Sequence, residues 1–319
     1  MNTDTPPESG RLPHLGVLRF TGPDAQSFLQ GQLSNDTARL AQGRSLLAAC
    51  SSPQGRVLAL MHLLPHSSGI AAILPGELLA ATAETLRKFV LRAKVKIEAG
   101  GELLSVAGHH DAQRLHSCGV ALPQSNTDYI ERDGVGVAAV GGDRSRYWVI
   151  AGAQTLAEHG LAGDAHRAEW VEHGWRLADI RAGLPQIYLA TREAFVAQMI
   201  NLDLLDGISF TKGCYTGQEI IARTQHLGRI KRRLYRLQLP AGDWRIGQPL
   251  HLTDGRTGRL VEVVRVGEAF EALAVLNLPA GAGSPPATEA ADGDAAASAA
   301  VAAASAAVAA APLPLPYPI

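Results

Sequence analysis

The chain has few cysteines and almost no net charge, and each shortage argues against a class of protein. Its 319 residues include only 3 cysteines (Cys50, Cys118 and Cys214), which lie far apart and form no Cys-x-x-Cys pair. A preformed zinc or iron–sulfur site within one chain is therefore not expected. The formal net charge of −1 gives no overall reason to expect nucleic-acid binding.

Long apolar runs are also missing. No segment approaches the roughly 20 apolar residues that cross a bilayer. The polar start of the chain, residues 1–10, contains two prolines and lacks the basic and apolar regions of a secretory signal. Together with the scarce cysteines, these absences predict a protein of a reducing cytoplasm with no membrane contact.

The length of 319 residues, with 46% hydrophobic residues, is enough for two or three domains. Short apolar segments at 15–20, 45–50, 56–64 and 70–74 are typical of strands, and residues 78–90 favour a helix. This alternation predicts an α+β domain over residues 12–100. Residues 101–236 begin with a looser version of the same pattern and form the expected second domain.

Residues 237–278 contain short strand-like segments separated by turn residues, which predicts a small β-barrel or sandwich. Residues 280–311 are mostly alanine and have no amphipathic face, so we expect a linker there. The chain becomes apolar again at 312–319, where a C-terminal strand is expected to return to the body of the protein.

The most informative segment is residues 212–219, which read Lys-Gly-Cys-Tyr-Thr-Gly-Gln-Glu. Thr216 and Glu219 have the spacing of a capping box, which predicts that a helix begins here. Cys214 would then lie in the positive field of that helix end, and Lys212 would add a second positive charge. Both favour the reactive thiolate. The alternative is a small buried cysteine in a tight turn, and residue chemistry alone leaves the two open.

The segment 212–219 resembles the signature of the YgfZ-type folate-binding proteins, relatives of the glycine-cleavage T-protein. Similar segments occur at 21–25, 28–36, 175–185, 201–210 and 221–232, so the resemblance covers about 12–278 plus the extreme C-terminus. It implies an α+β fold of three domains in a ring around a central folate-sized hole, the last domain being a small β-barrel.

The resemblance also implies a site. The expected cofactor is tetrahydrofolate or a one-carbon derivative, with Trp175, Tyr215 and Arg223 as binding residues. Trp175 could instead be a core anchor, because tryptophan is usually well buried. Cys214 would carry the chemistry with Lys212, and the remaining members of the motif are Gly213, Thr216, Gly217, Gln218 and Glu219.

By the same resemblance, the protein is an accessory factor that uses folate and Cys214 to assemble or repair iron–sulfur clusters in client enzymes, including tRNA-modifying ones. One alternative is a tetrahydrofolate-dependent one-carbon transferase. It is disfavoured because residues 55–60 and 74–82 offer only Glu77 where the T-protein has several carboxylates. The other is a direct tRNA-binding module, supported by the basic run from Arg223 to Arg236, although such a run is usually a solvated face. Whether the chain is an enzyme stays open.

Overall fold

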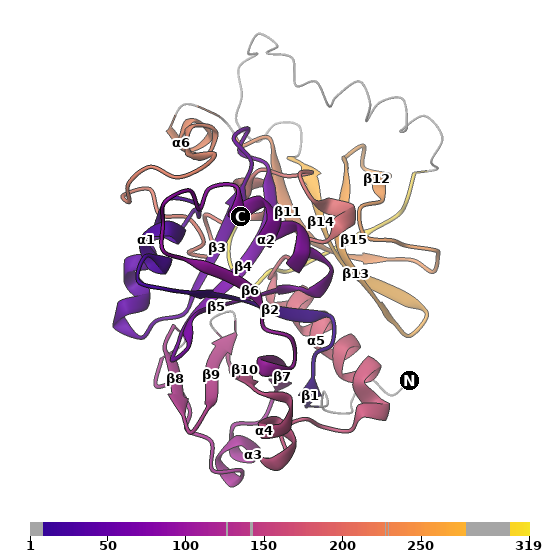
Figure 1. Cartoon of the computed structure of the whole chain (residues 1–319). Helices are drawn as coiled ribbons and strands as arrows, with labels where there is room; N and C mark the ends of the chain where they lie inside the picture. Colours follow the sequence, from indigo (N-terminus) through magenta and orange to yellow (C-terminus); the bar gives the residue numbers. More distant parts are fainter. Residues whose placement is uncertain (1–8, 126, 141–142, 227, 229, 279–306) are drawn as a thin grey trace.

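The computed structural model describes residues 9–125, 127–140, 143–226, 228, 230–278 and 307–319. Three antiparallel sheets of five strands each, with short helices at their margins, make up this described part (Figure 1). One longer helix, α5 (Ala168–Ala182), lies between them. The expected α+β class is confirmed. Within the described ranges, no helix is both long and apolar enough to cross a membrane.

The N-terminal sheet has an inner strand that is buried on both faces. Its strands are β2 (Leu15–Thr21), β3 (Leu46–Ser51), β4 (Val57–His66), β5 (Gly69–Pro75) and β6 (Lys96–Ala99), in the order β3-β4-β5-β2-β6. Beside it lie α1 (Ala25–Gln30), the 3-10 turns Thr37–Gln42 and Gly76–Leu78, and α2 (Leu79–Arg87). Leu60 and Met61 point to opposite faces of β4, yet both have 0% exposure. A strand covered on both sides reads as a continuous apolar run, and the four expected strands of this domain are confirmed.

The middle sheet takes its first strand from the start of the chain. Its strands are β1 (Gly10–Arg11), β7 (Ser105–His109), β8 (Tyr129–Arg132), β9 (Val135–Val140) and β10 (Asp143–Ala151), in the order β1-β7-β10-β9-β8. The helices α3 (Ala112–Ser117) and α4 (Ala153–Glu158) accompany it. Two further 3-10 turns, Gly101–Leu103 and Ala165–Arg167, precede β7 and α5. Because β1 pairs with β7, the chain enters the middle sheet before it builds the N-terminal one.

The C-terminal sheet begins earlier in the sequence than expected. Its strands are β11 (Arg232–Leu239), β12 (Pro249–His251), β13 (Thr257–Val266), β14 (Ala269–Asn277) and β15 (Ala311–Leu313), in the order β12-β13-β14-β11-β15. The expected boundary at 236/237 therefore falls inside β11. That strand lacks a regular apolar alternation, because its buried Leu234, Leu237 and Leu239 are unevenly spaced among arginines and other polar residues.

The last segment of the chain contacts both edges of the C-terminal sheet. Val308 pairs with Leu252 beside β12, and β15 pairs with β11 at the opposite edge. The last segment thus connects the two edge strands of the open sheet. This arrangement resembles the expected barrel, but the named strands do not pair in a closed ring. The expected linker lies mostly in 279–306, outside the described residues. Its predicted end at 311 is too late, because pairing begins at Val308.

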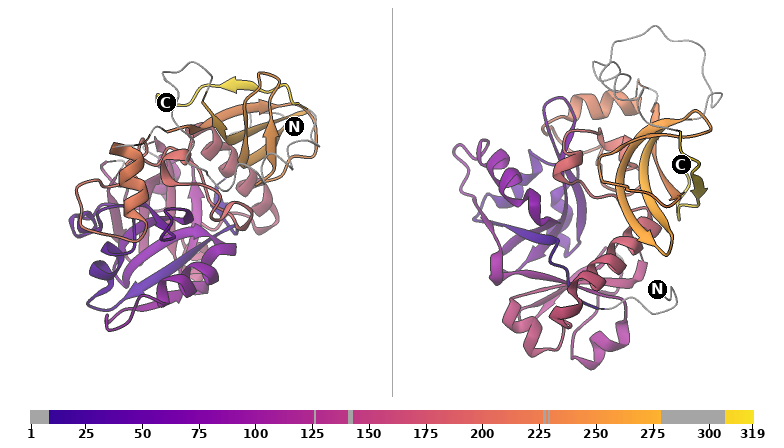
Figure 2. Two further views of the ribbon diagram at one scale, coloured as in Figure 1. Left: turned by 90° about the horizontal axis from the view of Figure 1, so that it is seen from above. Right: turned by 90° about the vertical axis from the view of Figure 1, so that its right-hand side faces the viewer.

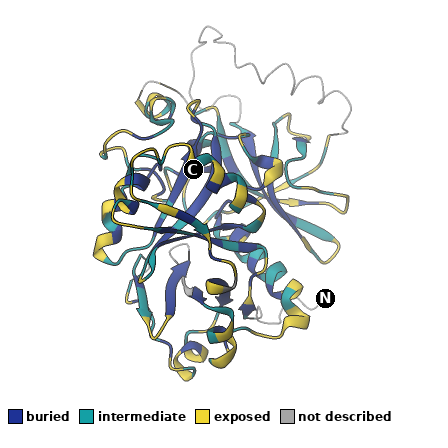
Figure 3. Cartoon of the chain, in the orientation of Figure 1, coloured by how far each residue is buried: buried dark blue, intermediate teal, exposed yellow. Residues whose placement is uncertain are grey.

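After α5, the chain returns across the N-terminal sheet through residues 183–217, which we call the return segment. It includes the 3-10 turns Leu189–Thr191 and Ala197–Ile200 and leads into α6 (Gln218–His226). Phe195, Ile200 and Leu202 of this segment belong to the same core as the N-terminal sheet. Figure 2 shows the three sheets arranged around α5 and the return segment, and Figure 3 shows that the sheet strands carry most of the buried residues.

The C-terminal tail is expected to stabilise this arrangement through Tyr317. Its hydroxyl donates a 2.7 Å hydrogen bond to the carbonyl oxygen of Gly183 at the end of α5. Replacing Tyr317 by alanine should lower the free energy of unfolding by about 2 kcal/mol, measured by urea denaturation, because a hydrogen bond and a half-buried ring are lost. The control Ile319→Ala removes a side chain that is 54% exposed and should change little. Equal effects of the two substitutions would show that the tail does not hold α5.

Candidate functional site

Cys214 is the accessible thiol of the chain. It is exposed in the loop that precedes α6, whereas Cys50 is buried in β3 and Cys118 is half-buried after α3. Burial raises the pKa of Cys50 to about 12, with Arg192 opposing the shift, so that thiol stays protonated and enclosed. Of the three cysteines, only Cys214 is therefore well placed to meet a partner or a small electrophile.

Lys212 holds the Cys214 loop against the N-terminal domain. Its Nζ lies 2.6 Å from the carbonyl oxygen of Gln30 and 2.8 Å from those of Leu33 and Asn35. An ammonium has three N–H donors, and these carbonyls use all of them. Burial lowers the pKa of Lys212 to about 8, with Asp36 opposing the shift. Lys212 is therefore an anchor of the loop, and its predicted effect on the thiol stays a prediction.

The capping box expected at Thr216 is not formed. The Thr216 hydroxyl donates instead to the side-chain oxygen of Gln32, at 3.2 Å, and α6 begins only at Gln218. Gly217 precedes the helix with a φ of +82°, and a Cβ there would lie 2.6 Å from the carbonyl oxygen of Ser52. Glycine is thus required both by the backbone conformation and by the close approach of the β3–β4 turn. Cys214 consequently lies further from the helix end than predicted.

The predicted folate-binding residues do not come together in one place. Tyr215 is 8% exposed and belongs to the N-terminal core, with the Lys212 ammonium 5.1 Å from its ring centre. Arg223 is exposed on α6. Trp175 has 0% exposure, and its ring centre lies 6.4 Å from that of Trp148 in the core between the first two sheets. For Trp175, this burial favours the alternative of a core anchor.

Two arginines of the basic run after the cysteine motif are neutralised by carboxylates of the protein itself. Its arginines in β11 bind acceptors of the protein itself: Arg232 binds Asn277, Arg233 binds Asp203 with two hydrogen bonds, and Arg236 binds Glu271. Such paired guanidinium groups are poor landing sites for phosphate. Arg233 and Arg236 therefore give a tRNA-binding module little support, while Arg223 and Lys231 are exposed.

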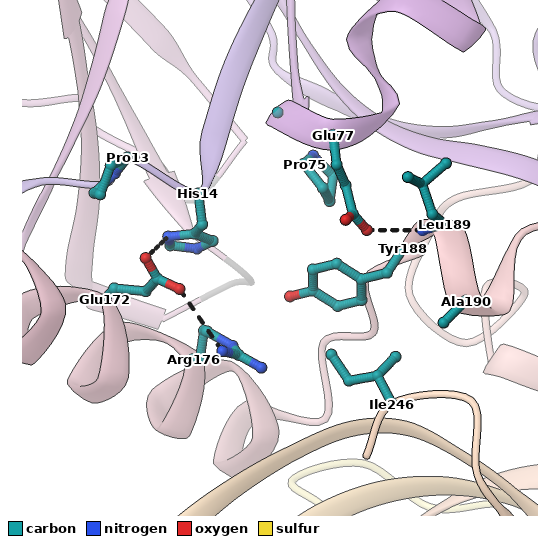
Figure 4. Close-up of a pocket in the computed structure, with 11 residues that line it drawn as sticks. Pro13, His14, Pro75, Glu77, Glu172, Arg176, Tyr188, Leu189, Ala190 and Ile246 are labelled. Atoms are coloured by element: carbon teal, nitrogen blue, oxygen red, sulfur yellow. Dashed lines mark hydrogen bonds and ion pairs between the residues drawn. The ribbon is translucent and has the colours of Figure 1, made fainter.

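A cavity of about 550 Å³ lies where the three domains meet (Figure 4). Its walls come from the connection before β2, the end of β5, helix α5, the return segment and the loop before β12. The lining residues are Pro13, His14, Pro75, Gly76, Glu77, Glu172, Arg176, Tyr188, Leu189, Ala190 and Ile246. Of these, sequence reasoning had singled out only Glu77, as the lone acid of its segment. Glu172 and Arg176 are four residues apart, a spacing that places both on one face of a helix. That spacing could have indicated a charged face of α5.

Charged groups of the cavity form a continuous chain of contacts. Glu172 lies 3.5 Å from Nδ1 of His14 and 3.7 Å from Arg176, and these two neighbours lower its pKa. Arg176 also donates to Glu262 at 2.6 Å, and Glu262 accepts a hydrogen bond from the Tyr188 hydroxyl. Burial, followed by Glu262, raises the pKa of Tyr188 well above its ordinary value. The cavity thus presents an ionised carboxylate, a guanidinium and a protonated phenol.

Glu77 lines the cavity on the side of the N-terminal sheet, opposite these charged groups. Its Oε1 accepts a 2.7 Å hydrogen bond from the backbone N–H of Leu189, which ties the end of β5 to the return segment. The Arg176 guanidinium lies on the opposite side, beside Glu172. Carboxylates, a guanidinium and apolar walls together are suited to a polar heterocyclic ligand.

Comparisons with known proteins identify the family. The chain is 31% identical over 266 residues to the tRNA-modifying protein YgfZ of Hamiltonella defensa, covering 80% of this chain and 71% of that one. It is also 31% identical over 277 residues to the YgfZ protein of Klebsiella pneumoniae, covering 82% and 84%. The chain belongs to the YgfZ family. No family model matches it.

Among solved structures, the chain is similar to the glycine cleavage system aminomethyltransferase T from Bartonella henselae. The TM-score is 0.56 at 15% identity, over 84% of this chain and 78% of that one. At this identity the likeness shows the fold and not the chemistry. It confirms for this YgfZ family member the T-protein-like architecture that the sequence predicted.

The exposure of the three thiols predicts their order of reactivity. Cys214 should be alkylated by iodoacetamide near pH 7 at least tenfold faster than Cys50, because Cys50 is buried with a pKa of about 12. Mass spectrometry after limited labelling measures the three rates, and half-buried Cys118 provides the internal comparison. Faster labelling of Cys118 or Cys50 than of Cys214 would contradict the assignment of Cys214 as the working thiol.

Proposed function

We propose that the protein is a folate-binding accessory factor for tRNA modification, which supports assembly or repair of iron–sulfur clusters in client enzymes through Cys214. Membership of the YgfZ family, whose relatives bear the name tRNA-modifying protein, supports the link to tRNA modification. The observation that carries the proposed role in iron–sulfur chemistry is the exposed Cys214 thiol. Its loop is held against the N-terminal domain by the hydrogen bonds of Lys212.

The central cavity has the size and donor set for a reduced folate. Its volume falls within the roughly 300–1,000 Å³ of small-molecule sites. The carboxylates of Glu77 and Glu172 can accept from the ring N–H and amino groups of a pterin, and the guanidinium of Arg176 can donate to its ring oxygen. Leu189 and Ile246 supply apolar wall. When bound, tetrahydrofolate would supply a nitrogen carrier for one-carbon units.

This location revises the expected roles of two residues. Trp175 precedes Arg176 on α5 and is fully buried. It therefore packs in the core and holds α5 in place, and it does not stack on the pterin. Arg223 is absent from the cavity lining, and Arg176 replaces it as the basic residue beside the ligand. YgfZ-type proteins often carry a second tryptophan before the first helix, where this chain has Leu15 or Gly16, and the missing aromatic residue supports a modest affinity.

The one-carbon transferase remains the second candidate because of one observation. Sequence reasoning found only Glu77 where the T-protein has carboxylates, but α5 brings Glu172 to the same cavity. Two carboxylates can divide the work of orienting a ligand and moving its proton. Folate chemistry in the cavity and cluster chemistry at Cys214 can therefore be tested separately.

Tetrahydrofolate should bind with a dissociation constant in the micromolar range or weaker, about 8 kcal/mol or less. Replacing Glu77 by glutamine should weaken binding about tenfold, because the amide keeps the shape but presents only one acceptor. Isothermal titration calorimetry under anaerobic conditions measures both. The control Glu84→Gln alters an exposed acid on α2 and should bind like wild type. The absence of binding to wild type would exclude the cavity as a folate site, and unchanged binding by Glu77→Gln would exclude Glu77 as a contact.

In cells that lack the native protein, the Cys214→Ala variant should fail to restore iron–sulfur enzyme activities and tRNA thiolation. Its abundance should remain normal, because an exposed loop thiol contributes little packing. Enzyme assays, nucleoside analysis and immunoblotting measure the three quantities, and Cys118→Ala is the matched control. Full complementation by Cys214→Ala would refute the proposal. Loss of glycine cleavage alone would instead favour the one-carbon transferase.

A further inference from the structure

The cavity contains a histidine that nothing in the proposed function has yet used. His14 lies in the connection between β1 and β2, and its carbonyl oxygen accepts a 2.8 Å hydrogen bond from the backbone N–H of Gly76. This contact fixes the backbone of His14 beside the end of β5, at the edge of the cavity. Its side chain is only 12% exposed and lines the cavity, where Figure 4 shows it beside Glu172.

We propose that His14 and Glu172 form a proton-transfer pair, in which Nε2 of His14 exchanges a proton with a nitrogen of the heterocyclic ligand in the cavity. Glu172 is the positioning residue of the pair. The inference rests on the proposed folate site, because it needs a ligand nitrogen to act on. It goes beyond that site by assigning the acid/base group that sequence reasoning found missing from this fold.

The geometry of the imidazole ring carries the argument. Nδ1 is buried and faces the Glu172 carboxylate at 3.5 Å, within the range of an ion pair. No hydrogen bond among the described residues involves Nε2, so that nitrogen is left for the ligand. A carboxylate on one ring nitrogen fixes the orientation and tautomer of the imidazole and stabilises the imidazolium form.

Glu172 is the charged group that contacts the ring, and further charges lie around the pair. From α5, Arg176 lies beside Glu172 and helps to keep it ionised, while Asp179 is paired with Arg146 of β10 at 2.7 Å. From the C-terminal sheet, Glu262 is shared between Arg176 and Tyr188. From the N-terminal side, Glu77 binds the backbone of Leu189. Each of these other charges thus has its own partner, and Asp179 also interacts electrostatically with His14, which adds to the negative charge near the ring.

The step itself is a simple proton exchange. Imidazolium His14 donates its Nε2 proton to a ligand nitrogen, which gains the proton and one positive charge while the ring becomes neutral. In the reverse direction the neutral Nε2 accepts that proton, and water at the cavity mouth restores the resting state. Imidazole is suited to both directions because it changes charge between about pH 5 and 8. No electron is transferred, so no oxidant or reductant is required.

Proton-linked calorimetry tests the pair. Tetrahydrofolate is titrated anaerobically into the full chain in buffers of different ionisation enthalpy, which gives the number of protons taken up on binding. Wild type should take up a fraction of one proton at about pH 7.5, because a ligand nitrogen that accepts from Nε2 favours the imidazolium. By linkage, its affinity should then fall as the pH rises from about 6 to 8.5.

Three variants separate the outcomes. His14→Gln should lose both the proton uptake and the pH dependence, Glu172→Gln should retain His14 but reduce the uptake, and the exposed control His166→Gln should behave like wild type. Thermal unfolding confirms that each variant is folded. Binding with the same proton uptake in His14→Gln and wild type would overturn the pair and leave the folate site standing. Failure of wild type to bind tetrahydrofolate would overturn both.

Discussion

Helix α5 is the constraint on which the rest of the structure depends, because its side chains reach all three sheets. Trp175 packs in the core between the N-terminal and middle sheets, and Ile180 packs in the core that the N-terminal sheet shares with the return segment. Its charged residues bind the other sheets in three pairs: Asp179 with Arg146, Arg176 with Glu262, and Arg181 with Glu271. Rotation of α5 about its own axis would break contacts on every side, so the cavity wall has one orientation.

These pairs differ in energetic weight. The pair of Asp179 and Arg146 is buried, and although burial raises the pKa of Asp179, Arg146 opposes that shift. Removing one partner of such a pair typically destabilises a protein by about 3–5 kcal/mol, because the other charge is left buried. Arg181 is 47% exposed, and an exposed pair contributes much less. The orientation of α5, and with it the placement of Glu172 and Arg176, therefore depends mainly on its buried side.

Features that neighbouring residues determine could be predicted from the sequence. Features that depend on contacts between distant segments could not. The apolar runs of the N-terminal strands and the position of the cysteine motif could be found because neighbouring residues specify them. The capping box failed because the Thr216 hydroxyl binds Gln32, 184 residues away in sequence. The anchoring role of Lys212 could not be predicted for the same reason, since its carbonyl partners belong to residues 30–35. The cavity draws its walls from five segments, so no local pattern could reveal it.

The cavity and the cysteine loop are joined by a stretch of backbone that buried amides hold in place. Gln198 donates to the carbonyl oxygen of Ile221 at 2.7 Å, and Asn201 exchanges hydrogen bonds with the backbone of Leu234. Both side chains have 0% exposure, and breaking such bonds leaves buried polar groups unpaired. Movement of Tyr188 in the cavity would thus have to disrupt this stretch before it displaced Cys214. The cavity and the Cys214 loop are therefore both held by one rigid stretch of backbone. We expect a ligand in the cavity to stabilise this stretch and to leave the position of the thiol unchanged.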